Sequence, residues 1–309
     1  MFALGCGAAP GEIIPPMNAA RVALVTCEKL PLLPLDEHLL VRALAERGVR
    51  AEPAVWSDSA VRWQDYGAVV VRSTWDYHHR LLEFVTWADG VAASGAALWN
   101  PAPLLYWNAE KTYLRDLAAR GINVVPTRYV TPREPVTLAA LLAEEHWERA
   151  IVKPTVSATA FGTFQVDRSE AASHEERFRA LCTHGGVMVQ PYLASIETDG
   201  EWSLCFVTGE FSHAILKRPK SGDFRVQLEF GGSAEQQVPP EWLVAQARHI
   251  LDLVDGPWLY ARVDGCLVDG SFQLIELEMI EPSLFLDRAP AAAPRMADAI
   301  VGVLNRKPS

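Results

Sequence analysis

The chain has 309 residues, half of them hydrophobic, and a formal net charge of -10. This length is enough for roughly two or three domains with buried cores. Charged residues of both signs are spread along the chain without a basic run, so nucleic acid is not an expected partner. No apolar run approaches the roughly 18 residues of a membrane helix, and no membrane partner is expected.

The five cysteines lie far apart, and no two of them form a Cys-x-x-Cys pair. An odd number without such spacing predicts neither a disulfide framework nor a zinc knuckle, and it fits a cytoplasmic protein. The sequence leaves open whether the chain acts alone or as a homo-oligomer.

Residues 1–20 contain Gly, Ala and Pro but no Lys or Arg. They lack the charged start and the apolar length of a signal peptide, so a disordered tail is predicted. A start codon placed too far upstream, with Met17 as the natural start, would explain the same pattern.

Residues 21–108 alternate predicted strands with predicted helices. Strands are expected at 21–27, before Trp56 and at 68–71, and helices from Asp36 to Gly48 and over 81–94. This alternation is typical of an open parallel α/β sheet.

From residue 109 onward the predicted strands are short and follow one another closely. They are expected at 127–130, 150–153, 162–166, 187–191, 202–208, 213–217, 259–263 and 272–277, before a closing helix at 291–304. The strands on either side of Gly209 form a predicted hairpin. This part is therefore expected to be α+β with antiparallel sheets.

A lysine and a loop of small residues form the first candidate site. Lys153 ends an apolar strand, where an ammonium group is costly to bury without a partner. The next loop contains Ser157, Thr159 and Gly162, and small residues let backbone N–H groups approach phosphate oxygens closely. Taken alone, the segment is more typical of a strand-edge lysine before an ordinary hairpin, and Lys111 alone reads as a solvated helix lysine.

A second candidate begins where a short apolar strand ends at Gln190. The extended turn with Tyr192 and Leu193 can offer backbone groups to a flat heterocycle. Glu197 or Glu201 can then accept hydrogen bonds from ribose hydroxyls. Two glutamates in a surface loop would look the same.

Three carboxylates near the end of the chain form the third candidate. Glu276 and Glu278 are two residues apart on a strand and project from one face, where like charges repel unless a cation neutralises them. Asp264 would complete an oxygen-ligand site suited to magnesium. An exposed acidic strand face is the alternative.

The order of these features along the chain resembles that of the ATP-grasp superfamily, and in particular its glutathione-synthetase-like branch. The resemblance covers about residues 21–305. It implies an N-terminal open parallel α/β (pre-ATP-grasp) domain at 21–108, followed by a two-subdomain ATP-grasp fold. Residues 109–190 would form the subdomain with a lid loop, and 191–305 the C-terminal subdomain with the metal site.

Three segments are similar to the cyclo-ligases that close O-ureido-serine to cycloserine, an antibiotic. They are 72–77 (Arg-Ser-Thr-Trp-Asp-Tyr), 223–227 (Asp-Phe-Arg-Val-Gln) and 280–285 (Ile-Glu-Pro-Ser-Leu-Phe). One departure concerns Glu278, because many ATP-grasp members carry Asn at that metal position.

The resemblance implies a ligase with ATP and magnesium as cofactors. A substrate carboxylate would become an acyl phosphate, and an amine would displace the phosphate to form a C–N bond. Lys111 and Lys153 would bind the α- and β-phosphates, and the three carboxylates would hold magnesium. Arg262 would stabilise the tetrahedral oxyanion. Arg225 would bind the transferred phosphoryl group or the substrate carboxylate, and Lys217 is a weaker candidate for the same region.

An amino-acid-like substrate is expected beyond the third strand of the first domain, because ligands of open α/β sheets bind at the carboxyl ends of strands. Arg72 would fork onto a carboxylate and Asp76 would take an ammonium, with Ser73 and Thr74 beside them. The alternative is that Trp75 and Tyr77 only pack between domains.

Two other functions stay open at this point. One is an intermolecular ligase that joins an amino acid or short peptide to an amine. The other is a nucleotide-binding module without catalysis, which the full set of Arg262, Asp264, Glu276 and Glu278 argues against.

Overall fold

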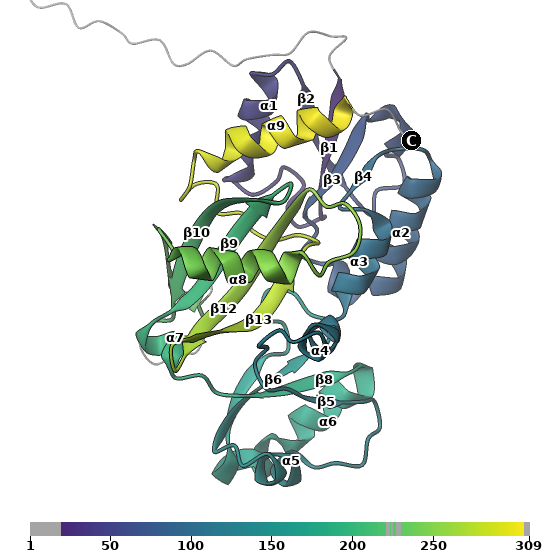
Figure 1. Ribbon diagram of the computed structural model, residues 1–309. Coiled ribbons are helices and arrows are strands. Elements are labelled where there is room, and N and C mark those ends of the chain that lie inside the picture. Colours follow the sequence, from purple (N-terminus) through teal and green to yellow (C-terminus); the bar gives the residue numbers. More distant parts are fainter. Residues whose placement is uncertain (1–19, 221–222, 224, 227–229, 306–309) are drawn as a thin grey trace, which may run out of the picture.

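The computed structural model describes residues 20–220, 223, 225–226 and 230–305. The predicted tail therefore lies outside the described residues except for residue 20, and so does part of segment 223–227. Figure 1 shows three layers along the molecule, with the first sheet at the top, a five-stranded sheet in the middle and a four-stranded sheet at the bottom.

The first sheet is parallel, with the strand order β2-β1-β3-β4. Its strands are β1 (Arg21–Thr26), β2 (Arg50–Val55), β3 (Ala68–Ser73) and β4 (Leu98–Trp99). The helices that belong to this part are α1 (Glu37–Ala45), α2 (Leu81–Ala93) and α3 (Ala102–Ala109). Strand β3 is buried on both faces, as a central parallel strand requires. The predicted open parallel α/β domain is confirmed.

The last helix, α9 (Ala292–Leu304), returns to this first sheet and lies beside α1 (Figure 1). Its buried residues Met296 and Ile300 share a hydrophobic cluster with Val22 and Leu40. By packing, α9 thus belongs with the N-terminal domain, whereas the predicted boundary placed it in the C-terminal subdomain.

The four-stranded sheet is antiparallel, with the order β5-β8-β6-β7. Its strands are β5 (Arg128–Val130), β6 (Arg149–Pro154), β7 (Phe164–Asp167) and β8 (Val187–Pro191). Helices α5 (Leu138–Glu144) and α6 (Glu175–His184) pack on it. Helix α4 (Tyr113–Ala119) precedes this unit and packs instead with the five-stranded sheet.

The five-stranded sheet is also antiparallel, with the order β11-β10-β9-β12-β13. Its strands are β9 (Glu201–Val207), β10 (Glu210–Arg218), β11 (Ser233–Gln237), β12 (Tyr260–Val268) and β13 (Ser271–Glu278). Helix α8 (Glu241–Leu251) covers one face, and the single-turn α7 (Ser195–Thr198) precedes β9. Gly209 turns the predicted hairpin at a φ of +85°, a conformation that favours glycine.

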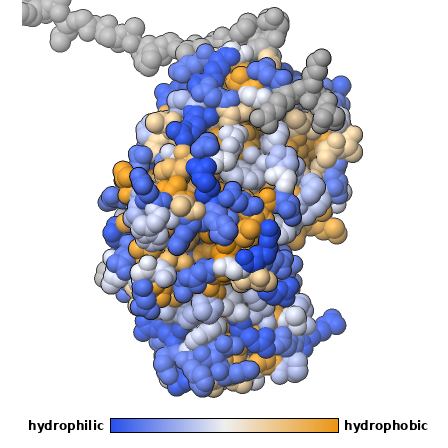
Figure 2. Space-filling view, viewed as in Figure 1, coloured by the Kyte–Doolittle hydropathy of each residue, from blue (hydrophilic) through white to orange (hydrophobic). Residues whose placement is uncertain are grey.

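Short 3-10 helices lie at η1 (Trp63–Asp65), η2 (Tyr77–His79) and η3 (Arg168–His174). Among the described helices, none has the length and apolar composition needed to cross a bilayer. In the space-filling view, hydrophilic residues are interspersed with hydrophobic ones over the visible face (Figure 2). The four cysteines in the described part of the chain are free and buried, in line with the absence of a disulfide framework there.

Candidate active site

The five-stranded sheet has one apolar face and one charged face. Leu204, Val263 and Leu277 belong to the cluster that packs with α8. Because successive strand residues point to opposite faces, the residues between them point away from that cluster. The register then brings Asp264 opposite Glu276, Arg262 opposite Glu278, and Lys217 opposite Glu201. The five charged residues on β9, β12 and β13 alternate along their strands with apolar residues. Lys217, on β10, lies on the same face because it pairs with Glu201.

A cavity of about 720 Å³ is lined by this charged face, by the four-stranded sheet and by part of the N-terminal domain. It brings together fourteen of the predicted residues, which come from segments more than 150 positions apart. They are Lys111, Lys153, Ser157, Thr159, Gln190, Tyr192, Leu193, Glu201, Lys217, Arg225, Arg262, Asp264, Glu276 and Glu278.

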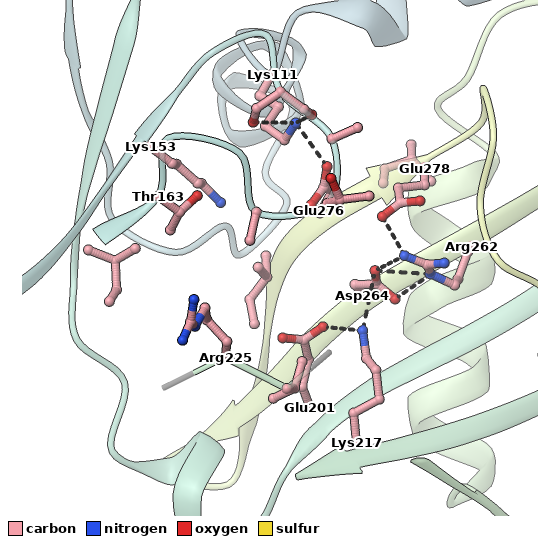
Figure 3. A pocket seen from close by; sticks show the side chains of 18 of the residues that line it. Lys111, Lys153, Thr163, Glu201, Lys217, Arg225, Arg262, Asp264, Glu276 and Glu278 are labelled. Atoms are coloured by element: carbon pink, nitrogen blue, oxygen red, sulfur yellow. Dashed lines mark hydrogen bonds and ion pairs between the residues drawn. The ribbon is translucent and has the colours of Figure 1, made fainter. Parts of the chain in front are cut away.

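Two lysines, Lys111 and Lys153, line the cavity from different segments of the chain (Figure 3). Lys111 Nζ donates to the Ser157 carbonyl at 2.6 Å and lies 3.1 Å from a carboxylate oxygen of Glu276. Lys153 is 9% exposed, and its ammonium contacts no hydrogen-bond or ion-pair partner among the described residues. Burial lowers the pKa of Lys153, with only partial compensation from Glu276. A buried cation without a partner is a favourable position for an anionic ligand.

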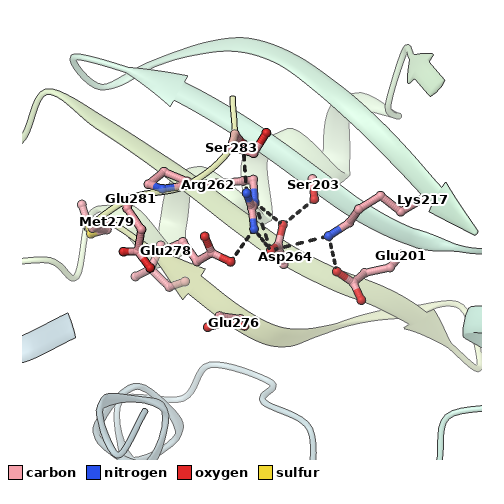
Figure 4. Close-up of polar contacts among 12 residues, drawn as sticks. Glu201, Ser203, Lys217, Arg262, Asp264, Glu276, Glu278, Met279, Glu281 and Ser283 are labelled. Atoms are coloured by element: carbon pink, nitrogen blue, oxygen red, sulfur yellow. Dashed lines mark hydrogen bonds and ion pairs between the residues drawn. The ribbon is translucent and has the colours of Figure 1, made fainter. Parts of the chain in front are cut away.

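Arg262 connects the carboxylates of the charged face (Figure 4). Its Nε and Nη2 donate to Asp264 at 3.0 and 2.9 Å, Nη2 also donates to Glu278, and Nη1 donates to the Ser283 carbonyl at 2.9 Å. Burial disfavours the Asp264 carboxylate, but the charges of Arg262 and Lys217 outweigh this effect and lower its pKa. The predicted oxyanion role of Arg262 stays a prediction, and the structure adds that Arg262 organises the site in its resting state.

Lys217 and Glu201 form a second ion pair on the same face, at 2.5 Å. Lys217 is also 3.7 Å from Asp264, and these two carboxylates raise its pKa against the opposing effect of burial. Glu197, the alternative to Glu201 as ribose ligand, accepts a hydrogen bond from Tyr192 and is not part of the cavity wall. The geometry therefore favours Glu201.

Asp264, Glu276 and Glu278 line one cavity and supply only oxygen donors, the ligands that magnesium prefers. Burial raises the pKa of Glu278 to about 7, although Arg262 opposes the shift. Each carboxylate is engaged by Arg262 or Lys111, and in the described part of the chain no three acidic, His or Cys side chains form a ready metal cluster. The donors fit magnesium by their chemistry, and the ion would replace Lys111 or Arg262 as their partner.

Part of the cavity wall is apolar. Val125, Ile151, Leu193 and Ile196 line it together with Tyr192. Gln190 is nearly buried there and donates from Nε2 to the Thr127 hydroxyl at 2.8 Å. A slot between aliphatic side chains suits a flat heterocycle, and the heterocycle role of this turn stays a prediction.

The predicted substrate residues of the first domain do not reach the cavity, and this prediction is corrected. Arg72 is 1% exposed and forks onto Glu37 with Nη2–Oε1 at 2.5 Å, so its guanidinium is not available to a substrate. Ser73 donates to Thr26, and Thr74 is fully buried. Asp76 accepts hydrogen bonds from Trp56 and Arg80. The sequence near Arg72 could not predict this ion pair, because its partner Glu37 lies 35 positions away.

Two predicted loop residues differ in their relation to the cavity. Arg225 lines it and pairs with Asp223 at 2.7 Å. Gly162 is not in the wall. Its φ is +72°, and an added Cβ would lie 2.9 Å from Pro154 Cγ, so the backbone itself requires glycine there.

Residues for which the sequence predicted no part in binding or catalysis also line the cavity. They are Trp75, Tyr77, Asn108, Glu281 and Ser283. Trp75 donates from Nε1 to the Glu281 carbonyl at 3.0 Å, which joins the first domain to segment 280–285. Segments 72–77 and 280–285 both resemble the cyclo-ligases in sequence, and the fold brings them into contact.

Comparison with protein families finds two matches. Residues 22–100 match the family described as D-cycloserine synthetase DcsG, N-terminal domain. Residues 115–255 match the family described as prokaryotic glutathione synthetase, ATP-grasp domain. The chain is 34% identical to the cycloserine biosynthesis protein DcsG of Streptomyces lavendulae over 288 residues, which is 87% of this chain and 94% of that protein.

Solved structures agree with these matches. The crystal structure of D-cycloserine synthetase DcsG is similar at a TM-score of 0.83 and 33% identity, over 93% of this chain and all of that chain. D-alanine–D-alanine ligase from Bacillus anthracis, complexed with ATP, shares the fold at a TM-score of 0.68 and 16% identity, over 93% of this chain and 97% of that chain. Fold, cavity and sequence similarity lead to one conclusion: the chain belongs to the DcsG family of ATP-grasp enzymes and is an ATP-dependent carboxylate–amine ligase.

Proposed function

We propose that this ligase cyclises a single small amino-acid derivative of the O-ureido-serine kind, with ATP and magnesium. The sequence similarity to a cycloserine-forming relative supports this, because it extends through the N-terminal domain as well as the nucleotide-binding part. The proposed reaction activates the substrate's own carboxylate as an acyl phosphate with release of ADP, and its oxygen-bound nitrogen then displaces phosphate to close a five-membered ring. Water must also hydrolyse the carbamoyl group from that nitrogen, which leaves as carbon dioxide and ammonia, before the product is cycloserine.

In this proposal the cations of the site carry most of the catalysis. Lys111 and Lys153 hold the phosphates and draw negative charge away from the transferred phosphoryl group. When bound, magnesium would be held by Asp264, Glu276 and Glu278 and would neutralise charge on the phosphates. Arg262 lies beside Asp264 and Glu278 and would stabilise the oxyanion that forms when the substrate nitrogen attacks the acyl phosphate.

The observation that carries the cyclisation proposal is the wall of the cavity beside Arg262. Trp75 and Tyr77 from the first domain and residues Glu281 and Ser283 line this end, and hydrogen bonds join the two sides. An end of the cavity lined from both sides in this way suits one small substrate better than a peptide and a separate amine.

The test is incubation of the protein with O-ureido-serine, ATP and magnesium, with ADP measured enzymatically and products by mass spectrometry. Cycloserine formed without a second amine supports the proposal. ADP release that needs both an amino acid and an added amine favours the intermolecular ligase, whose case rests on the glutathione-synthetase match over residues 115–255. The absence of ADP release with O-ureido-serine and with a panel of amino acids and amines would contradict both.

A further inference from the structure

Segment 279–284 has no regular secondary structure, yet each of its six consecutive backbone carbonyls accepts a hydrogen bond from a distant side chain. The donors to Met279 through Leu284, in order, are Asn100 (2.7 Å), Tyr260 (2.9 Å), Trp75 (3.0 Å), Arg72 (3.1 Å), Arg262 (2.9 Å) and His213 (2.8 Å). A loop held at every carbonyl is preorganised, and so are the side chains that it presents to the cavity.

Glu281 is the charged side chain that this segment presents. It lines the cavity and is 7% exposed. Its carboxylate has no hydrogen-bond or ion-pair partner among the residues that the structure describes, and Figure 4 shows no contact to it. Burial, together with the neighbouring charge of Glu278, raises the pKa of Glu281 well above its ordinary range. A buried carboxyl without a partner is costly unless a ligand supplies one.

The other carboxylates of the cavity are already engaged. Asp264 and Glu278 contact Arg262, Glu201 contacts Lys217, and Glu276 contacts Lys111. A phosphate would be repelled by Glu281, and a single carboxylate provides too few ligands for a divalent ion. An organic cation is the ligand class that fits. Asp76, the residue expected to take the substrate ammonium, is occupied by Trp56 and Arg80.

We propose that Glu281 binds the α-ammonium group of the substrate and thereby selects α-amino acids over the corresponding acids without an amine. The inference rests on the proposed function for the identity of the substrate. Glu281 lies two residues from Ser283, whose carbonyl is bound by Arg262. A substrate ammonium bound to Glu281 therefore places the amino acid beside Arg262, the residue proposed to stabilise the oxyanion at the acyl carbon.

The experiment compares wild type with Glu281→Gln, which keeps the size of the side chain and removes its charge. Calorimetry with magnesium and a non-hydrolysable ATP analogue gives Kd for O-ureido-serine and for 3-(ureidooxy)propanoic acid, which lacks the amine. Glu210→Gln, a 72% exposed glutamate on the surface, is the matched control. Circular dichroism checks folding, and the thermal midpoint of Glu281→Gln should equal or exceed that of wild type, because an unpaired buried carboxyl is removed.

Wild type should bind the amine-bearing ligand at least about tenfold more tightly than its analogue, as charge-assisted contacts do. Glu281→Gln should abolish that preference, and Glu210→Gln should retain it. An equal loss of both ligands in Glu281→Gln, or no preference in wild type, overturns the inference. If the amine preference depends on Glu281 but no cycloserine forms, the assignment of Glu281 stands and the cyclisation proposal fails.

Discussion

Arg72 and Glu37 bind each other inside the first domain through three hydrogen bonds, with Arg72 Nη2 2.5 Å from Glu37 Oε1. Both residues are at most 3% exposed, and Arg72 also donates to the Pro282 carbonyl at 3.1 Å. The pair thus connects α1, β3 and segment 279–284, which lines the cavity. Arg72 therefore has a structural role: it fixes the backbone of segment 279–284 without lining the cavity itself.

We expect Arg72→Met and Glu37→Met each to lower the free energy of unfolding by about 3–5 kcal/mol, because each leaves a buried charge without its partner. The double variant should recover much of this loss, because no unpaired charge remains. Urea denaturation followed by circular dichroism measures all three. If Arg72→Met unfolds like wild type and only weakens substrate binding, Arg72 is a substrate ligand after all.

Lys153 should behave in the opposite way on stability. Removal of its unpartnered buried ammonium by Lys153→Met should leave the thermal midpoint unchanged or raise it. The same change should weaken ATP binding roughly 10- to 100-fold, the effect of losing charge-assisted hydrogen bonds to phosphate. Calorimetric titration with ATP and magnesium tests this, with the exposed Lys29→Met as control. Unchanged ATP affinity in Lys153→Met would remove Lys153 from the nucleotide site.

Magnesium should be needed for tight ATP binding. Glu276, Glu278 and Asp264 would otherwise face the triphosphate with negative charge, and we expect EDTA to weaken ATP affinity at least about tenfold. Glu276→Gln and Glu278→Gln should each reduce this dependence on magnesium. Equal ATP affinity with and without EDTA in wild type would show that these carboxylates serve only their ion pairs with Lys111 and Arg262.

The order of short motifs predicted this fold because each motif depends on local chemistry. Gly209 marks a hairpin through its conformation, and the i, i+2 spacing of Glu276 and Glu278 places them on one strand face. Such features need no knowledge of distant partners. That Gln190, Glu201, Glu276 and Glu278 line one cavity was therefore predictable from the sequence, and their nucleotide and metal roles stay predictions.

The part of the cavity proposed to hold the substrate was not predictable in this way, because its contacts join segments far apart in the chain. Arg72 follows a strand as a ligand residue would, but its partner Glu37 lies on α1. The sequence around Glu281 did not predict a buried carboxylate. Its burial depends on segment 279–284, whose carbonyls accept hydrogen bonds from side chains in four other parts of the fold. The return of α9 to the first sheet likewise depends on packing that no local pattern encodes.

We predict that the lid loop expected within residues 109–190 is the segment 158–163 and that it is mobile. Thr159 and Ala160 adopt positive φ values of 50° and 56°, conformations that cost free energy without a compensating contact. Phe161 is half exposed and lies against His78 and His79. Amide hydrogen exchange at 158–163 should be fast without nucleotide and slower with ATP analogue and magnesium. Strong protection without nucleotide would contradict a lid.

The contact between His78 and this loop predicts a dependence of stability on pH. Both ring nitrogens of His78 are buried without a hydrogen-bond partner among the described residues, and burial, aided by His79, lowers its pKa from 6.5 to about 4. The unfolded chain therefore takes up a proton at a higher pH than the folded chain. The resulting contribution to stability is complete above pH 6.5 and is lost as the pH falls toward 4.

The loss attributable to His78 is at most about 3 kcal/mol, and less because the side chain is only partly buried. His78→Phe keeps a ring against Phe161 and cannot be protonated, so its stability should fall less than that of wild type between pH 7 and about 4. Urea midpoints measured across this range for wild type, His78→Phe and the exposed His249→Phe separate the effect of this site from that of other acid-titrating groups. Parallel curves for wild type and His78→Phe would mean that His78 is solvated in solution, and that Phe161 does not rest on it.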